Sequence, residues 1–380
     1  MIYLDNAATT FPKPKAVYDS VSLAMKRYIA NPGRSGHKPS IDAAIEIYNC
    51  RKSIADLFNA GGPENVVFTL NCTLASNIIL KGLLKPGDHV VLSCLEHNAV
   101  VRPLKDLESK GINLTVANVH PLDNEQTLNS FRNAINERTR LIVCMHASNV
   151  FGLKMPISRI AAMGHQYGIP IMVDAAQSAG LVNIDVSEDK IDYLCLAGHK
   201  GLYGPMGTGI LITANGDKLR TIIQGGTGIN SISYTQPELP PEKFESGTPN
   251  MIGISGLHAG VNFIRQVSEQ AISVHEFKLI EWLYDELKSI KGVILYTSRP
   301  NDEYFVPLIS FNVKDKNSEF VASMLNKNGI YVRAGLHCAP FAHKFFNTLE
   351  NGTVRVCPSF FTRPEEIKKF IFTLKKIILE

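Results

Sequence analysis

Long apolar runs, blocks of basic residues and an N-terminal leader pattern are all missing from this chain of 380 residues. No stretch approaches the ~18 apolar residues that a membrane-spanning helix needs. The first residues contain neither the basic segment nor the apolar segment of a signal peptide. The net charge is only +4 and is not gathered in one block, so nothing indicates nucleic acid or a membrane as a partner. With 45% hydrophobic and 19% charged residues, the composition is that of a globular protein and excludes general disorder.

Cysteine pairs with metal-binding or redox spacing are also absent. The seven cysteines are odd in number and widely separated, and no C-x-x-C occurs. We therefore expect neither a disulfide framework nor a zinc site, and no metal elsewhere, and we expect a reducing, cytoplasmic setting. Neither a G-x-x-x-x-G-K-[ST] loop nor a G-x-G-x-x-G between a strand and a helix is present, so a P-loop enzyme or a Rossmann dehydrogenase is unsupported.

What the sequence does contain is an alternation of short β-branched runs and helical stretches. The runs cover residues 66–69, 90–93, 141–145, 169–173, 193–196 and 209–212. This order predicts an α/β fold with a mostly parallel sheet. Ligands bind such sheets beyond the carboxyl ends of the strands. Residues 224–250, rich in Gly, Pro, Ser and Thr, are expected to form a long functional loop, and a second unit begins near residue 255.

Two residues at the ends of predicted strands, a carboxylate and an amine, could act in one site. Asp174 follows a buried run and could simply cap the sheet edge. Lys200 follows another run and is bracketed by glycines, which let the backbone approach a flat ligand. Partial desolvation would lower the pKa of its amine and favour the neutral nucleophile. The alternative is a glycine-rich turn in which the lysine has no chemical role.

A lysine and a carboxylate of this kind are the two partners that pyridoxal 5′-phosphate (PLP) requires. The lysine attaches to the aldehyde, and the carboxylate keeps the ring nitrogen protonated so that the ring withdraws electrons. The phosphate needs the N-terminus of a helix, and Thr73 lies where a predicted strand runs into a helix. Thr73 could instead be a plain N-cap. His97, after another strand, could stack on the ring or be structural.

These residues belong to a series of motifs that runs nearly end to end. The motifs are Tyr3-Leu-Asp-Asn-Ala-Ala8, Glu96-His97, His146-Ala-Ser-Asn149, Val173-Asp-Ala-Ala-Gln177, Gly198-His-Lys200, Phe244-Glu-Ser-Gly-Thr-Pro-Asn250 and Arg333-Ala-Gly-Leu-His-Cys-Ala339. In this order and spacing the chain resembles a cysteine desulfurase of the class V aminotransferase fold, in the group II branch that includes the selenocysteine lyases. The resemblance implies fold type I of the PLP-dependent transferases. It divides the chain into an N-terminal segment (1–14) packed on the small domain, a large PLP-binding domain (15–255) and a small α+β C-terminal domain (256–380).

The resemblance also implies a role for each motif residue. Lys200 is the Schiff-base lysine, Asp174 partners the ring nitrogen and His97 stacks on the ring. The remaining cofactor residues are Gln177 at the ring hydroxyl, Asn149 beside the ring, and the backbone of Cys72 with Thr73 and His199 at the phosphate. Thr248 resembles the residue that reaches the phosphate of a second subunit, which implies a homodimer. Arg355 resembles the arginine that grips the substrate carboxylate, where the alternative is a surface arginine on a strand edge. Arg34 and His37 lie where the family approaches the mouth of the site.

Cys338 decides the activity within this fold. In isolation it is a plain loop cysteine, but the resemblance implies a nucleophilic thiolate near a cationic site. The other cysteines lie mostly in apolar runs and are expected to be inert core thiols. The implied reaction converts L-cysteine to L-alanine: Lys200 moves the α-proton, and Cys338 takes the sulfur as a persulfide for an unidentified acceptor.

Three alternatives to a cysteine desulfurase are two other kinds of PLP-dependent enzyme and one non-catalytic role. A selenocysteine lyase or cysteine sulfinate desulfinase would depend less on Cys338, and another class V aminotransferase or lyase would not need it. A non-catalytic sulfur-assembly partner or PLP-sensing module would not need Lys200 and Asp174. The chain also departs from its relatives at Ala197, Leu336 and Asn98, where serine, histidine and histidine are common. Gly226-Thr227-Gly228 is a candidate replacement for the missing serine hydroxyl.

Overall fold

The computed structural model describes residues 1–379. The helices are α1 (Lys15–Arg27), α2 (Lys38–Leu57), α3 (Cys72–Leu83), α4 (Asn98–Glu108), α5 (Asn124–Ala134), α6 (Ile157–Gln166), α7 (Met251–Val267), α8 (Glu269–Ser289), α9 (Ser318–Lys327), α10 (Pro340–Phe345) and α11 (Pro364–Leu379). The strands are β1 (Ile2–Tyr3), β2 (Val66–Thr69), β3 (His89–Ser93), β4 (Asn113–Ala117), β5 (Thr139–Met145), β6 (Ile171–Asp174), β7 (Tyr193–Ala197), β8 (Gly209–Ile212), β9 (Val293–Leu295), β10 (Ile309–Val313), β11 (Ile330–Tyr331), β12 (Arg333–Gly335) and β13 (Thr353–Val356).

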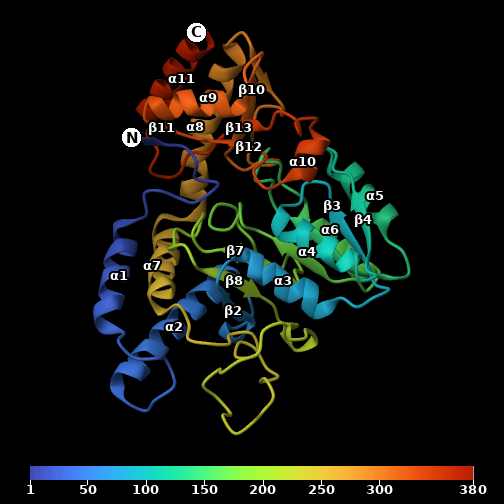
Figure 1. Cartoon of the computed structure of the whole chain (residues 1–380), viewed down its shortest axis with the longest axis vertical. Coiled ribbons are helices and arrows are strands. Elements are labelled where there is room, and N and C mark those ends of the chain that lie inside the picture. The colour runs from blue at the N-terminus through green and yellow to red at the C-terminus, as the bar shows by residue number, and fades with distance from the viewer. Residues whose placement is uncertain (380) are drawn as a thin grey trace.

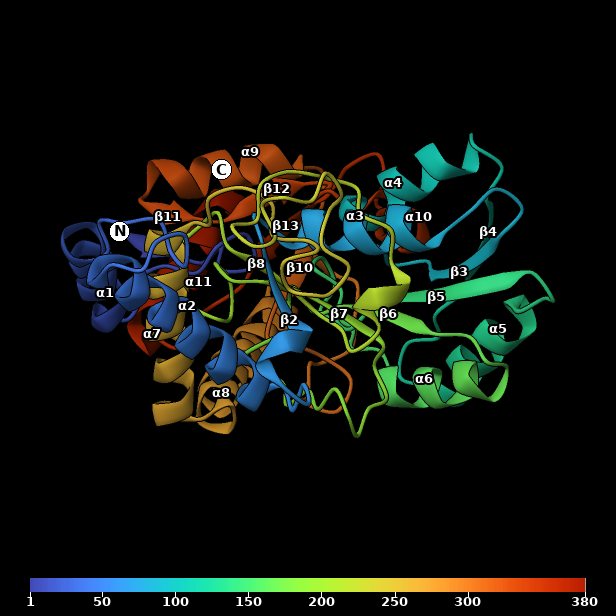
Figure 2. The ribbon, with the colours of Figure 1, turned by 90° about the horizontal axis from the view of Figure 1, so that it is seen from below.

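A seven-stranded sheet forms the centre of the larger unit, in the order β2-β8-β7-β6-β5-β3-β4. The neighbours from β4 to β7 are all parallel, and β8 is antiparallel to both β7 and β2. Only β8 therefore runs against the rest, and the predicted α/β fold with a mostly parallel sheet is confirmed. Helices α3 and α4 cover one face of the sheet and α5 and α6 lie on the other (Figures 1 and 2).

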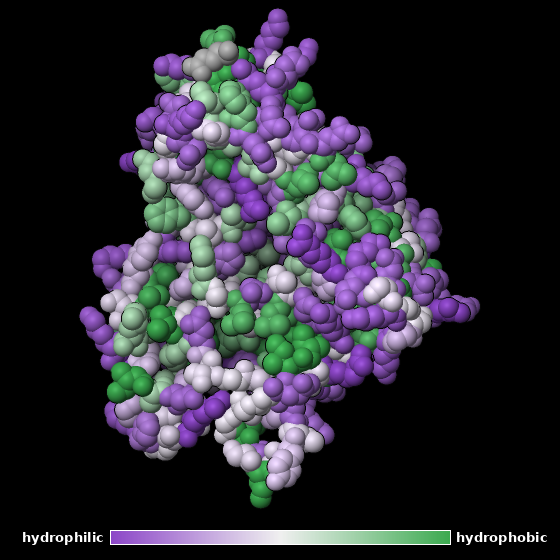
Figure 3. All heavy atoms as spheres, in the orientation of Figure 1, coloured by the Kyte–Doolittle hydropathy of each residue, from purple (hydrophilic) through white to green (hydrophobic). Residues whose placement is uncertain are grey.

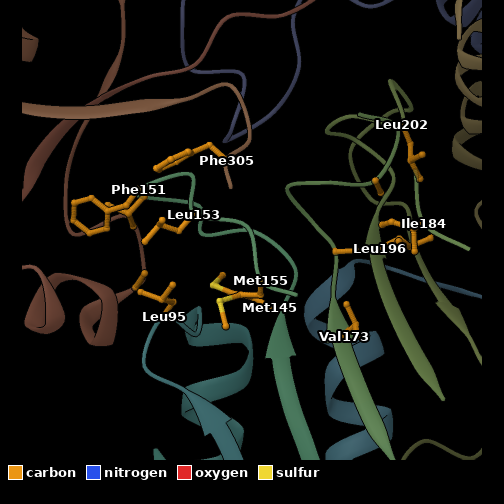
Figure 4. Packing of buried hydrophobic residues seen from close by; sticks show 14 of the residues in the cluster. Leu95, Met145, Phe151, Leu153, Met155, Val173, Ile184, Leu196, Leu202 and Phe305 are labelled. Carbon is orange, nitrogen blue, oxygen red and sulfur yellow. The ribbon is translucent and has the colours of Figure 1, made fainter. Parts of the chain in front are cut away.

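The alternation of side chains along β5 shows why this sheet is buried on both faces. Leu141 and Val143 pack in the core under α3 and α4, whereas Ile142 and Cys144 belong to the core on the opposite face. Successive side chains of a strand point to opposite faces, so a continuous apolar run serves both layers. Figure 4 shows part of this opposite-face core where the strands end: Met145 lies beside Met155, and Phe151 lies near Leu153.

The smaller unit contains an antiparallel sheet in the order β12-β13-β10-β9. Helices α8, α9 and α11 pack on and around it (Figure 1). The N-terminal strand β1 pairs in parallel with β11 of this unit. The predicted boundary between residues 255 and 256 falls inside α7, which packs on α1 and α2. The division into domains stays a prediction.

The expected loop at residues 224–250 contains no helix or strand. It projects from the larger unit at the bottom of Figure 1, and Figure 3 shows hydrophobic residues at its tip. No helix within residues 1–379 has the length and apolar character to cross a membrane.

Candidate active site

A cavity of about 220 Å³ lies beyond the carboxyl ends of β5, β6 and β7, where the fold class predicts a ligand site. The N-terminus of α3 and the start of α4 close its sides. It is lined by Ala8, Asn71, Cys72, Thr73, His97, Ala99, Met145, Ala147, Asn149, Asp174, Ala176, Gln177, Ala197, His199 and Lys200. Eight of the predicted site residues therefore meet in one cavity: Cys72, Thr73, His97, Asn149, Asp174, Gln177, His199 and Lys200.

Asp174 is the last residue of β6 and is buried, with 4% of its surface exposed. Its Oδ1 accepts a hydrogen bond from the backbone N–H of Ala176 at 2.9 Å, and the Cys72 thiol donates to the same oxygen at 3.5 Å. These contacts hold the carboxylate in one orientation. Asp174 therefore lines the cavity and also caps the end of β6 through the backbone of Ala176.

Lys200 lies three residues beyond β7, in a turn whose glycines leave no room for a Cβ atom. A Cβ at Gly201 would lie 2.2 Å from the carbonyl oxygen of Ala179, and one at Gly198 would lie 2.3 Å from Oγ1 of Thr208. Burial lowers the pKa of Lys200, and the nearby Asp174 charge opposes that shift. A lowered pKa favours the neutral amine that a nucleophile or base needs.

His97 is the N-cap of α4, and its Nδ1 accepts from the backbone N–H of Ala99 at 3.0 Å. Burial lowers the pKa of His97 to about 4. The ring is therefore neutral near pH 7 and carries its proton on Nε2. A neutral ring fixed at the cavity wall is suited to stacking on an aromatic ligand.

The other end of the cavity has the features of a phosphate site. Asn71 caps α3 by accepting from the backbone N–H of Leu74, so Thr73 is not the N-cap and its hydroxyl is left exposed at the helix N-terminus. Nδ1 of His199 and Oδ1 of Asn149 are buried and have no hydrogen-bond partner among the described residues. Buried polar atoms are normally paired, so these atoms indicate a missing polar ligand. The residues fit PLP: a lysine, a carboxylate, a stacking ring and a helix N-terminus surround one cavity.

Cys338 is exposed and lies in a loop with a left-handed backbone, with φ of 49° at His337 and 56° at Cys338. Nη2 of Arg333 lies 3.8 Å from its Sγ. The Asn149 side chain, which lines the cavity, donates to the carbonyl of His337 at 2.8 Å. Burial lowers the pKa of His337 to about 2, so its ring is neutral near pH 7. The other cysteines are buried, except the half-buried Cys357.

Arg355 lies in the interior of the smaller sheet, since β13 is flanked by β12 and β10. Only 1% of its surface is exposed, so the alternative of a surface arginine on a strand edge is wrong. Its Nη2 contacts Oδ1 of Asp5 at 2.7 Å, and its Nη1 donates to the carbonyl of Asn149 at 2.8 Å. The sequence motifs predict no role for Asp5, although it lies in Tyr3-Leu-Asp-Asn-Ala-Ala8.

Five predicted site residues do not line the Lys200 cavity: Cys338 and Arg355, described above, and Thr248, Arg34 and His37. Arg34 and Thr248 line a separate cavity of about 340 Å³, where Arg34 donates to the carbonyl of Gly226 at 2.9 Å. Thr227 and Gly228 line the same cavity, so the candidate replacement for the missing serine is also away from Lys200. His37 is the N-cap of α2. Within one chain none of these residues lines the cavity that holds Lys200.

Comparison with known proteins agrees with this geometry. The family model of aminotransferase class-V matches residues 2–370. The chain belongs to the class-V aminotransferase family. Probable cysteine desulfurases of Methanothermobacter thermautotrophicus and Borreliella burgdorferi are each 33% identical, over 99% and 100% of this chain and 94% and 92% of theirs. The apo structure of a cysteine desulfurase from Thermococcus onnurineus is 31% identical, with a TM-score of 0.91, covering 100% of this chain and 94% of that one.

The comparisons confirm several predictions made from the sequence. The class V aminotransferase fold and the resemblance to the cysteine desulfurases are confirmed, and with them a PLP-dependent enzyme. The group II branch and the role of each site residue stay predictions.

Proposed function

We propose that this enzyme removes sulfur from L-cysteine, releases L-alanine and holds the sulfur as a persulfide on Cys338. The observation that carries the proposal is the link between cavity and loop. Asn149 lines the cavity that contains Lys200 and Asp174, and its side chain donates to the residue before Cys338. A substrate bound against Lys200 would thus lie next to the loop that carries the exposed thiol.

The cavity residues would hold the cofactor in the predicted way. They are Lys200, Asp174, Gln177, His97, Asn149, Cys72, Thr73 and His199, with Thr248 contributed by a second subunit. PLP, when bound, supplies the electron sink that stabilises negative charge at the substrate α-carbon. Asp174 would face the ring nitrogen because Ala176 holds its carboxylate in place.

Lys200 would act as the base at the α-carbon. Its lowered pKa leaves a larger neutral fraction near pH 7, and a neutral amine can accept the α-proton and return it. The Cys338 thiolate would attack the substrate sulfur, so that an S–S bond forms while the Cβ–S bond breaks. Cβ would keep the electron pair of the broken bond and take up a proton in place of the one that the Cys338 thiol released, which yields alanine.

Substrate recognition would rest on Arg355, assisted by Asn149, with Arg34 and His37 at the mouth of the site. A guanidinium can bind a carboxylate through two parallel hydrogen bonds. The persulfide on the exposed Cys338 would then pass to an acceptor protein, or to a thiol reductant that releases sulfide.

The enzyme would work as a homodimer in which Thr248 reaches the second active site. Apolar side chains are exposed along one face of α2, at Ile41, Ile45 and Tyr48, each 46–54% exposed. The loop at residues 224–250 adds Ile232 and Tyr234, which are almost fully exposed. Exposed apolar side chains on a helix face and in a loop support the proposal that this part of the surface contacts another protein chain. A cavity that contains Thr248 lies against the same loop.

The test is the product balance of PLP-loaded protein with L-cysteine. Wild type should form alanine and, with reductant, an equal amount of sulfide. Cys338→Ala should keep the PLP absorbance and lose at least about 100-fold in alanine formation. Leu336→Ala, an exposed neighbour in the same loop, is the matched control and should be near wild type. Normal turnover of L-cysteine by Cys338→Ala would contradict the proposal, and turnover of L-selenocysteine alone would favour a selenocysteine lyase.

A further inference from the structure

The segment from Asp5 to Lys13, here called the N-terminal strap, contacts both Arg355 and the turn that carries Lys200. At one end Asp5 pairs with Arg355. At the other, the hydroxyl of Thr10 donates to the carbonyl of Lys200 at 2.8 Å. In between, the carbonyl of Ala7 accepts from the Gln177 side chain at 3.0 Å. A segment of nine residues thus joins the arginine to the lysine turn, which is 155 residues away in the sequence.

The strap is fixed where it meets Arg355. The backbone of Asp5 forms a bridge with Cys357, and the Asn6 side chain donates to the carbonyl of Cys357 at 2.9 Å. Asp5 therefore approaches the guanidinium from a strand-like position rather than from a free loop. Its carboxylate is the one acidic group paired with Arg355 within residues 1–379.

The guanidinium of Arg355 is only partly satisfied. Of its five N–H groups, one donates to Asp5 and one to the carbonyl of Asn149. Nε is buried and has no partner among the described residues. A buried charged donor without a partner is costly, so the group is prepared for another acceptor. The Asn149 contact places it beside the cavity that contains Lys200.

We propose that Asp5 is a positioning residue for carboxylate recognition: it holds the buried Arg355 guanidinium in place so that its remaining N–H groups bind the α-carboxylate of an amino acid. This inference rests on the proposed function, because it takes Arg355 as the carboxylate site. It assigns the N-terminal strap to the substrate site rather than to the packing of the small domain alone. The ion pair with Asp5 fixes the orientation of the guanidinium. Without Asp5 that orientation would be lost, and a carboxylate that needs two well-aligned N–H donors would bind less tightly.

The test is equilibrium binding of two amines to the PLP-loaded protein, followed by the absorbance of the cofactor. L-Alanine carries the carboxylate, and isopropylamine has the same carbon branching without it. Asp5→Asn keeps the shape of the side chain and removes the charge. It should weaken L-alanine binding by roughly tenfold or more and leave isopropylamine binding unchanged. Asp5→Glu, which restores the charge, should recover part of the loss.

Asp19→Asn is the matched control, since Asp19 pairs with Lys15 on the exposed surface of α1 and should change neither amine. Equal weakening of both amines by Asp5→Asn would overturn the inference, because it would show a general structural effect. Unchanged or tighter L-alanine binding would also overturn it, the latter by showing that Asp5 competes with the substrate. Arg355→Gln distinguishes a failure of the role given to Asp5 from a failure of the role given to Arg355. If this variant also leaves L-alanine binding unchanged, Arg355 is not the carboxylate site and that part of the proposed function fails as well.

Discussion

The backbone N–H of Asn98 donates to the carbonyl of Cys338 at 2.8 Å. This bond ties the cysteine loop to the first residue of α4, directly beside His97 in the cavity wall. The common histidine at position 98 is absent here, but the contact uses the backbone and does not depend on the side chain. The loop is therefore held at the cavity although the Cys338 side chain is exposed.

His337 is expected to be the main anchor of this loop. Its ring is buried, stacks on His343 at a centroid distance of 5.7 Å and lies 3.1 Å from the carbonyl of Thr353. His337→Ala should destabilise the protein by about 2–4 kcal/mol, because it leaves a cavity and an unpaired carbonyl. Urea unfolding measures this loss, and alanine formation from L-cysteine should fall while the PLP absorbance is kept. A stable variant with full activity would show that the loop does not need this anchor.

Glu276 should give the protein a component of stability that is lost at high pH. It is buried in α8, and burial raises the pKa of its carboxyl from an ordinary 4.5 to about 8. Because the folded pKa is raised, the native state binds more protons than the unfolded state between these values. The contribution is fully present below pH 4.5 and is lost as pH rises through 8.

The difference in free energy of unfolding between wild type and Glu276→Gln isolates this effect. Buried histidines such as His146, whose pKa is lowered to about 3, also make stability depend on pH, but they do so equally in both proteins. The stability of Glu276→Gln relative to wild type should increase from pH 5 to pH 9 by a few kcal/mol in urea unfolding. The exposed Glu137→Gln is the control and should show no such trend. A constant difference across this range would mean that Glu276 titrates normally.

Shared active sites predict complementation between two damaged subunits. Lys200→Ala should lose at least about 1000-fold in activity, because both the attachment point and the base are gone. Thr248→Ala should bind PLP more weakly in each of its sites. In a co-expressed heterodimer, one site has Lys200 from one chain and Thr248 from the other, so PLP affinity at that site should return to the wild-type value. A heterodimer without this recovery, or a monomer by sedimentation, would contradict the shared site.

Much of this site is predictable because its residues end strands. A buried parallel strand has an obvious apolar run, and the residue that follows it must lie at the carboxyl edge of the sheet. Local patterns alone therefore predict that Asp174 and Lys200 lie together. The search for apolar runs misses strand β4, because Asn113–Ala117 is only partly buried at the edge of the sheet and alternates polar and apolar residues.

Contacts between distant segments could not be predicted in this way. Asp5 and Arg355 are 350 residues apart, and nothing in the pattern of either segment indicates their pairing. The boundary near residue 255 followed a change of composition, yet α7 continues through it because its apolar face packs on α1 and α2. Thr248 and Arg34 lie outside the Lys200 cavity of their own chain, which only the three-dimensional arrangement reveals.

The most direct test of the account is the position of the sulfur after one turnover. PLP-loaded protein is incubated with L-cysteine without reductant, and the peptide that contains Cys338 is analysed by mass spectrometry alongside the alanine released. The account predicts one additional sulfur atom on Cys338 and one alanine for each subunit. Alanine formed without added sulfur on Cys338, or sulfur on another cysteine, would contradict it.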